Sequence, residues 1–275
     1  MQIILYTVLL LGGIGAFAAL ALYLTAKKFK VEEDSRIDLV EAALPGANCG
    51  GCGQAGCRQF AEKCVKAGSL DGLRCPVGGD ATMRAIADGL GLQAGESDPQ
   101  VAVIRCAAEC LKRPTTNRYD GAKNCSVAHM LYIGETDCAY GCFGFGDCIA
   151  ACQFGALSQN SETGAIEVNA DKCTACGACA KACPRHLIEI RRKGPKNRYV
   201  YVACANQDKG AVARKACENA CIGCTKCQKT CEWDAIQIEH NLAHIDGDKC
   251  RMCRKCEEAC PTKAIRSVHF TNEKA

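Results

Sequence analysis

The sequence has few of the features that mark a nucleotide-dependent enzyme or a nucleic-acid-binding protein. It has no G-x-x-x-x-G-K-[ST] loop, and no G-x-G-x-x-G lies between a predicted strand and a predicted helix. The short GFG at 144–146 lies inside a cysteine loop. One Trp and a net charge of +4 do not suggest a nucleic-acid surface. Because nothing resembles an activated serine or a catalytic carboxylate pair, we expect no bond-making catalytic site in this chain.

Cysteine is abundant instead, with 26 among 275 residues. This density is typical of a small secreted disulfide scaffold or of a cytosolic protein that binds several metal centres. The cellular compartment decides between the two, because cytosolic thiols stay reduced unless a metal holds them.

Charge is absent from residues 3–24, a run long enough to cross a bilayer as a helix. A cleaved signal peptide would need positive charge ahead of this run, whereas here the lysines follow it at 27–30. The positive-inside rule then predicts a single-pass anchor at 1–30 in the cytoplasmic membrane, with the bulk of the chain on the cytoplasmic side. The cysteines would therefore bind metal.

The stretch CTACGACAKACP at 173–184 has the spacing C-x2-C-x2-C-x3-C-P, and CRMCRKCEEACP at 250–261 repeats it. A structural zinc site needs two separated pairs of ligands, which this run does not provide. The spacing is the signature of bacterial two-cluster ferredoxins, in which three cysteines bind one [4Fe-4S] cluster and the fourth binds the neighbouring cluster. We therefore predict two tandem ferredoxin-like modules.

In the second module this rule assigns every ligand. One cluster is predicted on Cys221, Cys224, Cys227 and Cys260, and the other on Cys231, Cys250, Cys253 and Cys256. Glu232 replaces the proline after Cys231, which does not affect a ligand.

The first module is less regular. Its second cluster is predicted on Cys152, Cys173, Cys176 and Cys179. Its first run, CAYGCFGFGDCIAAC, has the spacing C-x3-C-x5-C-x3-C, and we predict a cluster there on Cys138, Cys142, Cys148 and Cys183. A three-iron cluster or a different ligand set is the alternative. Gln153 again stands in place of proline.

A separate block, NCGGCGQAGC, begins at residue 48. With the later cysteine of a Cys-Pro pair it predicts one further [4Fe-4S] cluster, on Cys49, Cys52, Cys57 and Cys75. Its glycines allow backbone amides to approach the cluster. Zinc remains the alternative at this isolated site. Five clusters are thus expected in total.

Six cysteines are left over: Cys64, Cys106, Cys110, Cys125, Cys204 and Cys217. We expect Cys64 to be a packed thiol. Cys106 and Cys204 end the strand-like runs VAVIRC and YVYVAC, and Cys125 and Cys217 follow them. These four predict a further site or, as the interpretation we favour, two buried thiol pairs.

The expected fold is α+β. It combines an N-terminal transmembrane helix, a small helical iron–sulfur domain and two tandem bacterial-ferredoxin-like 2[4Fe-4S] modules. The expected boundaries are 1–30 for the anchor, 31–91 for the single-cluster domain, 92–137 for a connecting segment, 138–190 for the first module, 191–217 for an insert and 218–275 for the second module.

The order of these parts, with CGGCGQAGC, YGCFGFGDC, KGAVARKAC and CIGCTKC, resembles the B-type subunit family of the Rnf complex in its longer form. The resemblance implies an electron-transfer subunit of a membrane-bound oxidoreductase that moves electrons between reduced ferredoxin and NAD, coupled to Na⁺ or H⁺ transport. It implies soluble ferredoxin as electron donor, the lipid bilayer, and membrane and NAD-binding subunits as partners, with no nucleic acid.

Three alternatives belong to other classes. They are an electron-transfer subunit of another anaerobic dehydrogenase, a redox sensor, and a zinc-stabilised binding protein. The basic stretch RRKGPKNR at 191–198 suggests electrostatic steering of an acidic ferredoxin, or else an ordinary solvated loop.

Overall fold

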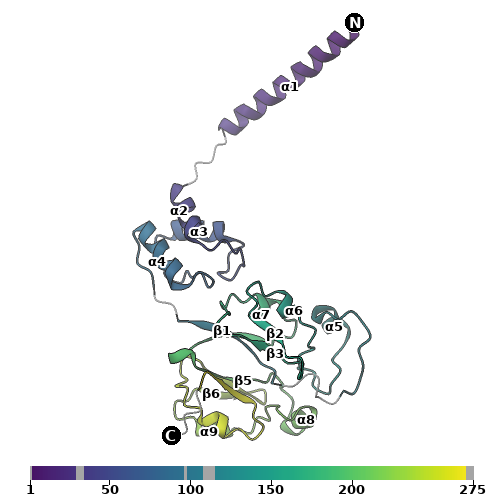
Figure 1. Ribbon diagram of the computed structural model, residues 1–275, viewed down its shortest axis with the longest axis vertical. Helices are drawn as coiled ribbons and strands as arrows, with labels where there is room; N and C mark the ends of the chain where they lie inside the picture. Colours follow the sequence, from purple (N-terminus) through teal and green to yellow (C-terminus); the bar gives the residue numbers. More distant parts are fainter. Residues whose placement is uncertain (1, 29–33, 96–97, 108–114, 271–275) are drawn as a thin grey trace.

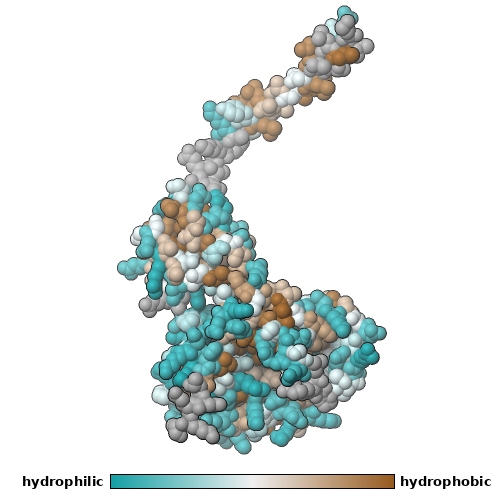
Figure 2. All heavy atoms as spheres, in the orientation of Figure 1, coloured by the Kyte–Doolittle hydropathy of each residue, from teal (hydrophilic) through white to brown (hydrophobic). Residues whose placement is uncertain are grey.

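The computed structural model describes residues 2–28, 34–95, 98–107 and 115–270 (Figure 1). Helix α1 (Gln2–Lys28) is 27 residues long and carries its only charges, Lys27 and Lys28, in the last turn. Its large apolar side chains are exposed, as Phe17 is at 75%, and Figure 2 shows hydrophobic residues along it. None of the helices in these ranges is long and apolar enough to cross a membrane, so the structure does not support the single pass predicted at 1–30.

In the next part, residues 34–95, the regular elements are all helices, joined by loops. They are α2 (Ser35–Ala43), α3 (Cys57–Ala67) and α4 (Gly79–Leu90). Helix α2 begins where the Asp34 carboxylate accepts a hydrogen bond from the Arg36 amide at 3.0 Å, an N-cap that satisfies an otherwise unpaired donor. The helices pack around Val40, Phe60 and Ile86, which are at most 2% exposed. The helical iron–sulfur domain expected here therefore has a core of its own.

Two bodies of similar construction follow, which we call the first and second modules. The first has the hairpin β2 (Leu157–Gln159)–β3 (Ile166–Val168), and the second has the hairpin β6 (Ile236–Glu239)–β7 (Leu242–Ile245). A pair of short helices accompanies each hairpin: α6 (Asp147–Ala150) with α7 (Ala178–Ala182), and α9 (Lys226–Thr230) with α10 (Lys255–Glu258).

Each module also has a second antiparallel strand pair, completed by a strand from outside its cysteine runs. Strand β1 (Gln100–Ile104) pairs with β4 (Ile188–Arg192), and β5 (Tyr199–Val202) pairs with β8 (Ile265–Val268). The remaining short elements are α5 (Cys125–Leu131), η1 (Pro195–Asn197) and α8 (Gly210–Ala216). The strands predicted from VAVIRC and YVYVAC are thus present, as the first strand of each pair.

Strand β1 joins the two modules because both of its faces are buried, which explains its unbroken apolar sequence. Ala102 and Ile104 point into the core of the first module. Val101 and Val103 lie on the opposite face and pack with Tyr199 of β5. The alternation of side chains along a strand therefore divides β1 between two cores.

Arg191 strengthens the same contact. Its guanidinium donates to the carbonyl oxygens of Val200, at 3.3 Å, and of Ile245, although the side chain is only 8% exposed. Arg192 forms ion pairs with Asp98 and Asp248. Of the first two arginines of the basic stretch 191–198, Arg191 is thus buried, and Arg192, which is 45% exposed, has its charge paired with carboxylates.

Candidate iron–sulfur cluster sites

The three regular cysteine loops share one backbone conformation. In each loop the second and fourth residues after the first cysteine have positive φ angles, which turn the chain so that it folds around its cysteines. Residues other than glycine are strained there, and such strain is characteristic of functional sites. The pairs are Ala175 (φ 56°) and Gly177 (φ 78°), Gly223 (φ 61°) and Thr225 (φ 60°), and Met252 (φ 59°) and Arg254 (φ 66°).

In the second module the structure gathers the cysteines into the two predicted sets. Burial, followed by the neighbouring thiols of Cys221, Cys224 and Cys260, raises the pKa of Cys227 to about 11. In the other set, burial first and then the thiols of Cys250 and Cys253 raise the pKa of Cys256 to about 12.

Cys231 completes this second set, because its thiol is among the neighbours that raise the pKa of Cys250, after burial. The backbone therefore places the last cysteine of each run beside the other run, as the ferredoxin signature requires.

The regular set of the first module is also brought together. Burial raises the pKa of Cys179 to about 11, and the neighbouring thiols that add to the shift are Cys173, Cys176 and Cys152. This set lies next to the helical domain, because a Cβ built on Gly51 would come within 2.8 Å of the carbonyl oxygen of Cys176. The Lys181 ammonium donates to the Gly50 carbonyl at 3.5 Å across the same contact.

The irregular run has the same loop conformation, but it begins at Cys142. The second and fourth residues after Cys142 are Gly144 (φ 80°) and Gly146 (φ 86°). Cys148 then occupies the place of the third cysteine of a regular loop, and Phe145 occupies the place of the second. This loop therefore supplies two cysteines where the others supply three.

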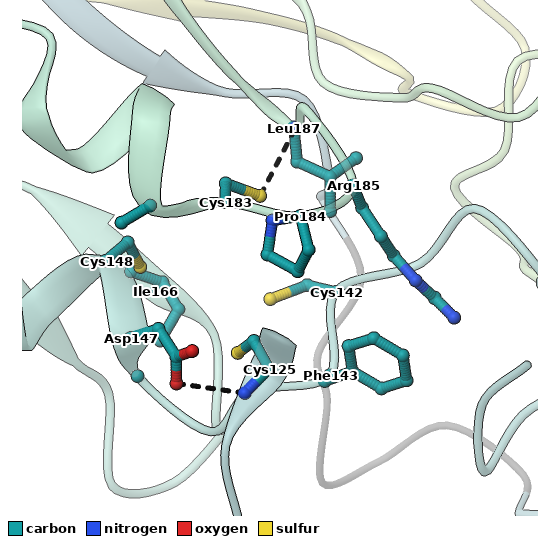
Figure 3. A pocket seen from close by; sticks show the side chains of 12 residues that line it. Cys125, Cys142, Phe143, Asp147, Cys148, Ile166, Cys183, Pro184, Arg185 and Leu187 are labelled. Carbon is teal, nitrogen blue, oxygen red and sulfur yellow. Dashed lines mark hydrogen bonds between the residues drawn. The ribbon is translucent and has the colours of Figure 1, made fainter. Parts of the chain in front are cut away.

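Cys125 takes the missing place. Figure 3 shows one cavity surrounded by Cys125, Cys142, Cys148 and Cys183. The Asp147 carboxylate accepts hydrogen bonds from the amides of Cys125 at 2.9 Å and Ser126 at 3.2 Å, which fixes the start of α5. Burial, followed by the thiols of Cys125 and Cys183, raises the pKa of Cys148 to about 12.

Cys138, which the sequence predicts at this site, lies elsewhere. It lines a second cavity with Cys106, Cys204 and Cys217. The alignment of CFGFGDC with the regular loops, with Cys148 opposite Cys179, would have given the correct start of the run from sequence alone. The position of Cys125 would still have been missed, since it lies outside the run.

A third cavity belongs to the helical domain. Cys49, Cys52, Cys57 and Cys75 line it, as the sequence predicts. The Asn48 side-chain oxygen accepts from the Cys57 amide at 2.7 Å and so closes the loop around the cavity. Cys64 instead lies in the core of this domain, 0% exposed, where burial raises its pKa to about 11. It is the packed thiol that was expected.

Backbone amides donate to the sulfur atoms at many of these positions, which is how proteins stabilise cluster-bound thiolates and adjust their potentials. The N···S distances are 3.3–3.5 Å. The acceptors are Cys49, Cys75, Cys106, Cys152, Cys173, Cys183, Cys204, Cys250 and Cys260.

A single metal ion is a poor match for this arrangement. Among the residues that the structure describes, no group of three or more His, Cys, Asp or Glu side chains is placed to hold one ion, and none of the described cysteines forms a disulfide. A four-iron cluster needs its four thiols spread around a cavity, one for each iron, and the three cavities provide that. The sets of thiols and the donors to sulfur therefore fit [4Fe-4S] clusters.

Comparison with protein families agrees with these sites. Residues 44–77 match the family described as "Putative Fe-S cluster", residues 166–189 match a 4Fe-4S binding domain, and residues 220–264 match a 4Fe-4S dicluster domain. Iron–sulfur domains of the expected kinds are thus present in the helical domain and in both modules.

Curated relatives cover most of the chain, and all three described here are B-type subunits of ion-translocating complexes. The one from the Na⁺-translocating ferredoxin:NAD⁺ oxidoreductase complex of Acetobacterium woodii is 42% identical over 90% of this chain and 73% of its own length. The one from the ion-translocating oxidoreductase complex of Methanosarcina acetivorans is 41% identical over 96% of this chain and 98% of its own length. The one from the proton-translocating ferredoxin:NAD⁺ oxidoreductase complex of Clostridium ljungdahlii is 38% identical over 86% of this chain and 82% of its own length. The chain therefore belongs to the B-type subunit family of the ion-translocating oxidoreductase complex, the Rnf family that its sequence resembles.

Proposed function

We propose that this chain is an electron-relay subunit of a membrane-bound ion-translocating oxidoreductase complex. It accepts electrons from reduced ferredoxin and passes them to partner subunits and finally to NAD, coupled to Na⁺ or H⁺ transport. The observation that carries the proposal is the row of neighbouring four-thiol sites in a chain whose relatives are named as subunits of such complexes.

Five of these sites are proposed to hold [4Fe-4S] clusters, which supply one-electron redox chemistry when bound. Four ligand sets are those predicted from the sequence, and in the fifth Cys125 replaces Cys138. The sets are Cys49/Cys52/Cys57/Cys75, Cys125/Cys142/Cys148/Cys183, Cys152/Cys173/Cys176/Cys179, Cys221/Cys224/Cys227/Cys260 and Cys231/Cys250/Cys253/Cys256. The same proposal divides the chain near residues 30, 91, 137, 190 and 217, with β4 extending past residue 190 to Arg192 and with β1 and β5 completing the modules from the flanking segments.

The residues between the sites keep them close together. Gly51 has no side chain, and this allows the loop of the helical domain to lie against Cys176. Within each module the two sets are neighbours, since Cys148 lies near Cys179 and Cys256 lies near Cys227. Close spacing of this kind lets an electron move between sites without any change of fold.

Helix α1 is proposed to attach the chain to the cytoplasmic membrane, in contact with the partner subunits. The support for this is the exposed apolar surface along the helix, which is unfavourable in water, and the two lysines in its last turn. A chain lacking residues 2–28 should appear in the supernatant after cell disruption and keep its iron, while the full chain should resist extraction with carbonate. Equal extraction of both forms would contradict this assignment.

The function is tested with purified chain, prepared without oxygen and mixed with reduced ferredoxin. The brown absorbance near about 400 nm that iron–sulfur clusters give should decrease as electrons enter, without any other subunit present. A sample that contains iron but is not reduced by ferredoxin would contradict the role as entry point. A colourless sample that contains zinc would contradict the cluster sites themselves.

A further inference from the structure

The second cavity is a four-cysteine site that the ferredoxin pattern does not include. Four separate segments bring Cys106, Cys138, Cys204 and Cys217 to its wall. Its empty space is about 320 Å³, close to the 340 Å³ and 310 Å³ of the two cavities assigned to clusters above. All three cavities are therefore similar in empty space, counted with the part open to solvent, and each is lined by four cysteines.

The two strands that join the modules end at this cavity. Cys106 follows β1 and Cys204 follows β5, and the Ala107 amide donates to the Ala203 carbonyl at 2.7 Å, which fixes the two strand ends together. Cys217 ends α8, where its amide donates to the Ala213 carbonyl. Three of the four thiols thus lie at or just beyond the ends of regular elements, and Cys138 comes from a loop.

Hydrogen bonds to sulfur are as well developed here as at the ferredoxin-type sites. The amide of Cys142 donates to the sulfur of Cys106 at 3.5 Å, and the amide of Cys221 donates to that of Cys204 at 3.3 Å. Asn206, a polar residue only 1% exposed, donates from its side chain to the sulfur of Cys138 and from its backbone to that of Cys204, both at 3.4 Å. Donors aimed at sulfur stabilise thiolates, whereas neutral buried thiols need no such donors.

We propose that Cys106, Cys138, Cys204 and Cys217 hold a sixth [4Fe-4S] cluster, and that this site connects the two modules electronically. The inference rests on the proposed function, in which the five other sites hold clusters. Cys142 and Cys221, whose amides bond to its sulfurs, are ligands of the neighbouring sites in the first and second modules. One electron enters from one neighbour and leaves to the other, and no bond or proton is exchanged. Asn206 is a positioning residue for this site.

Iron counts test the proposal directly. The full chain, prepared without oxygen, should contain about 24 irons if six four-iron sites are filled, and about 20 if only five are filled. Cys204→Ala should lose about four irons. The matched control is Cys64→Ala, which removes a buried thiol that lines none of the three cavities and should keep all the iron.

Double variants show which cysteines share a site. Cys138→Ala combined with Cys204→Ala should lose only about four irons, because both residues serve one cluster, whereas Cys125→Ala combined with Cys204→Ala should lose about eight. A loss of about eight irons from the Cys138/Cys204 pair and of about four from the Cys125/Cys204 pair would place Cys125 in the cavity between the modules and overturn the assignment. A loss of one zinc from Cys204→Ala, with about 20 irons retained, would overturn it as well.

The wild-type count remains decisive if a variant fails to fold. About 20 irons that ferredoxin reduces would refute the sixth cluster and leave the proposed relay intact. In Asn206→Leu, the iron content should stay at the wild-type level while the reduction potential of one cluster becomes more negative in an EPR titration, because a donor to sulfur is lost. Unchanged potentials throughout would show that Asn206 has only a structural role.

Discussion

Replacing Gly51 with alanine should loosen the contact between the helical domain and the first module. The new Cβ would lie 2.8 Å from the Cys176 carbonyl oxygen and 2.9 Å from both the Cys176 Cα and the Pro76 ring. Ordinary contacts between carbon atoms need about 3.5 Å or more, so the two loops must separate by roughly 0.6 Å. Two of the three obstructing atoms belong to the backbone and cannot turn aside. Overpacking of this kind costs about 1–3 kcal/mol, which would weaken the contact about 5- to 150-fold.

Hydrogen exchange measured by mass spectrometry on the iron-loaded protein is the assay. Amides in 47–57 and 173–181 should exchange faster by up to that factor, because they open with the contact. Gly89→Ala is the matched control, since a Cβ on this residue of α4 meets nothing within 4 Å and should stabilise the helix by about 1 kcal/mol. If Gly51→Ala keeps its iron and its exchange rates, the two parts are not held together through this glycine.

Three further predictions concern the ligands and the approach of ferredoxin. Cys125→Ala should lose about four irons. Adding Phe145→Cys should restore them, because Phe145 occupies the place of the second cysteine of a regular loop. An iron count that stays low after Phe145→Cys would refute the alignment of the loop 142–148 with the regular loops. Acidification should release iron from the site of Cys148, whose thiol pKa burial raises to about 12, since a proton then competes well with iron for the sulfur; iron release measured against pH should rise as pH falls, and a flat profile would contradict this. Lys196→Gln should leave the salt dependence of reduction by ferredoxin unchanged, because its neighbours Arg191, Arg192 and Lys193 are bonded within the protein and one exposed lysine adds little attraction at a distance; a smaller slope would show that 191–198 steers the donor after all.

The ferredoxin-type sites could be predicted from sequence because their ligands follow one another in the chain. Local turns within one loop position three cysteines, such as Cys221, Cys224 and Cys227, so their placement depends little on tertiary contacts. The partner cysteine Cys260 was also predictable, because the two-cluster motif exchanges its last cysteines.

The irregular run was assigned differently by sequence and structure for a physical reason. The spacing from Cys138 to Cys152 permits two starting points, and only the φ angles at Gly144 and Gly146 show that the loop begins at Cys142. Cys125 reaches this site through the hydrogen bonds between Asp147 and the start of α5, a tertiary contact that no spacing rule contains.

The cavity between the modules was only partly predictable from sequence. A further site on Cys106, Cys125, Cys204 and Cys217 was one of two interpretations, and the structure has Cys138 in place of Cys125. The pairing of VAVIRC with YVYVAC was visible, but two buried thiol pairs were the favoured interpretation. What brings Cys106 and Cys204 together is the packing of β1 against Tyr199 and the bond from Ala107 to Ala203. These contacts join segments about a hundred residues apart, which makes them invisible to periodicity.

Rapid mixing of the iron-loaded chain with reduced ferredoxin tests whether this chain conducts electrons through thiolate-bound clusters. The decrease in absorbance near about 400 nm should correspond to more than one electron taken up per chain, because several clusters are reduced one after another. A chain that carries its iron but takes up no electrons from ferredoxin would contradict the account.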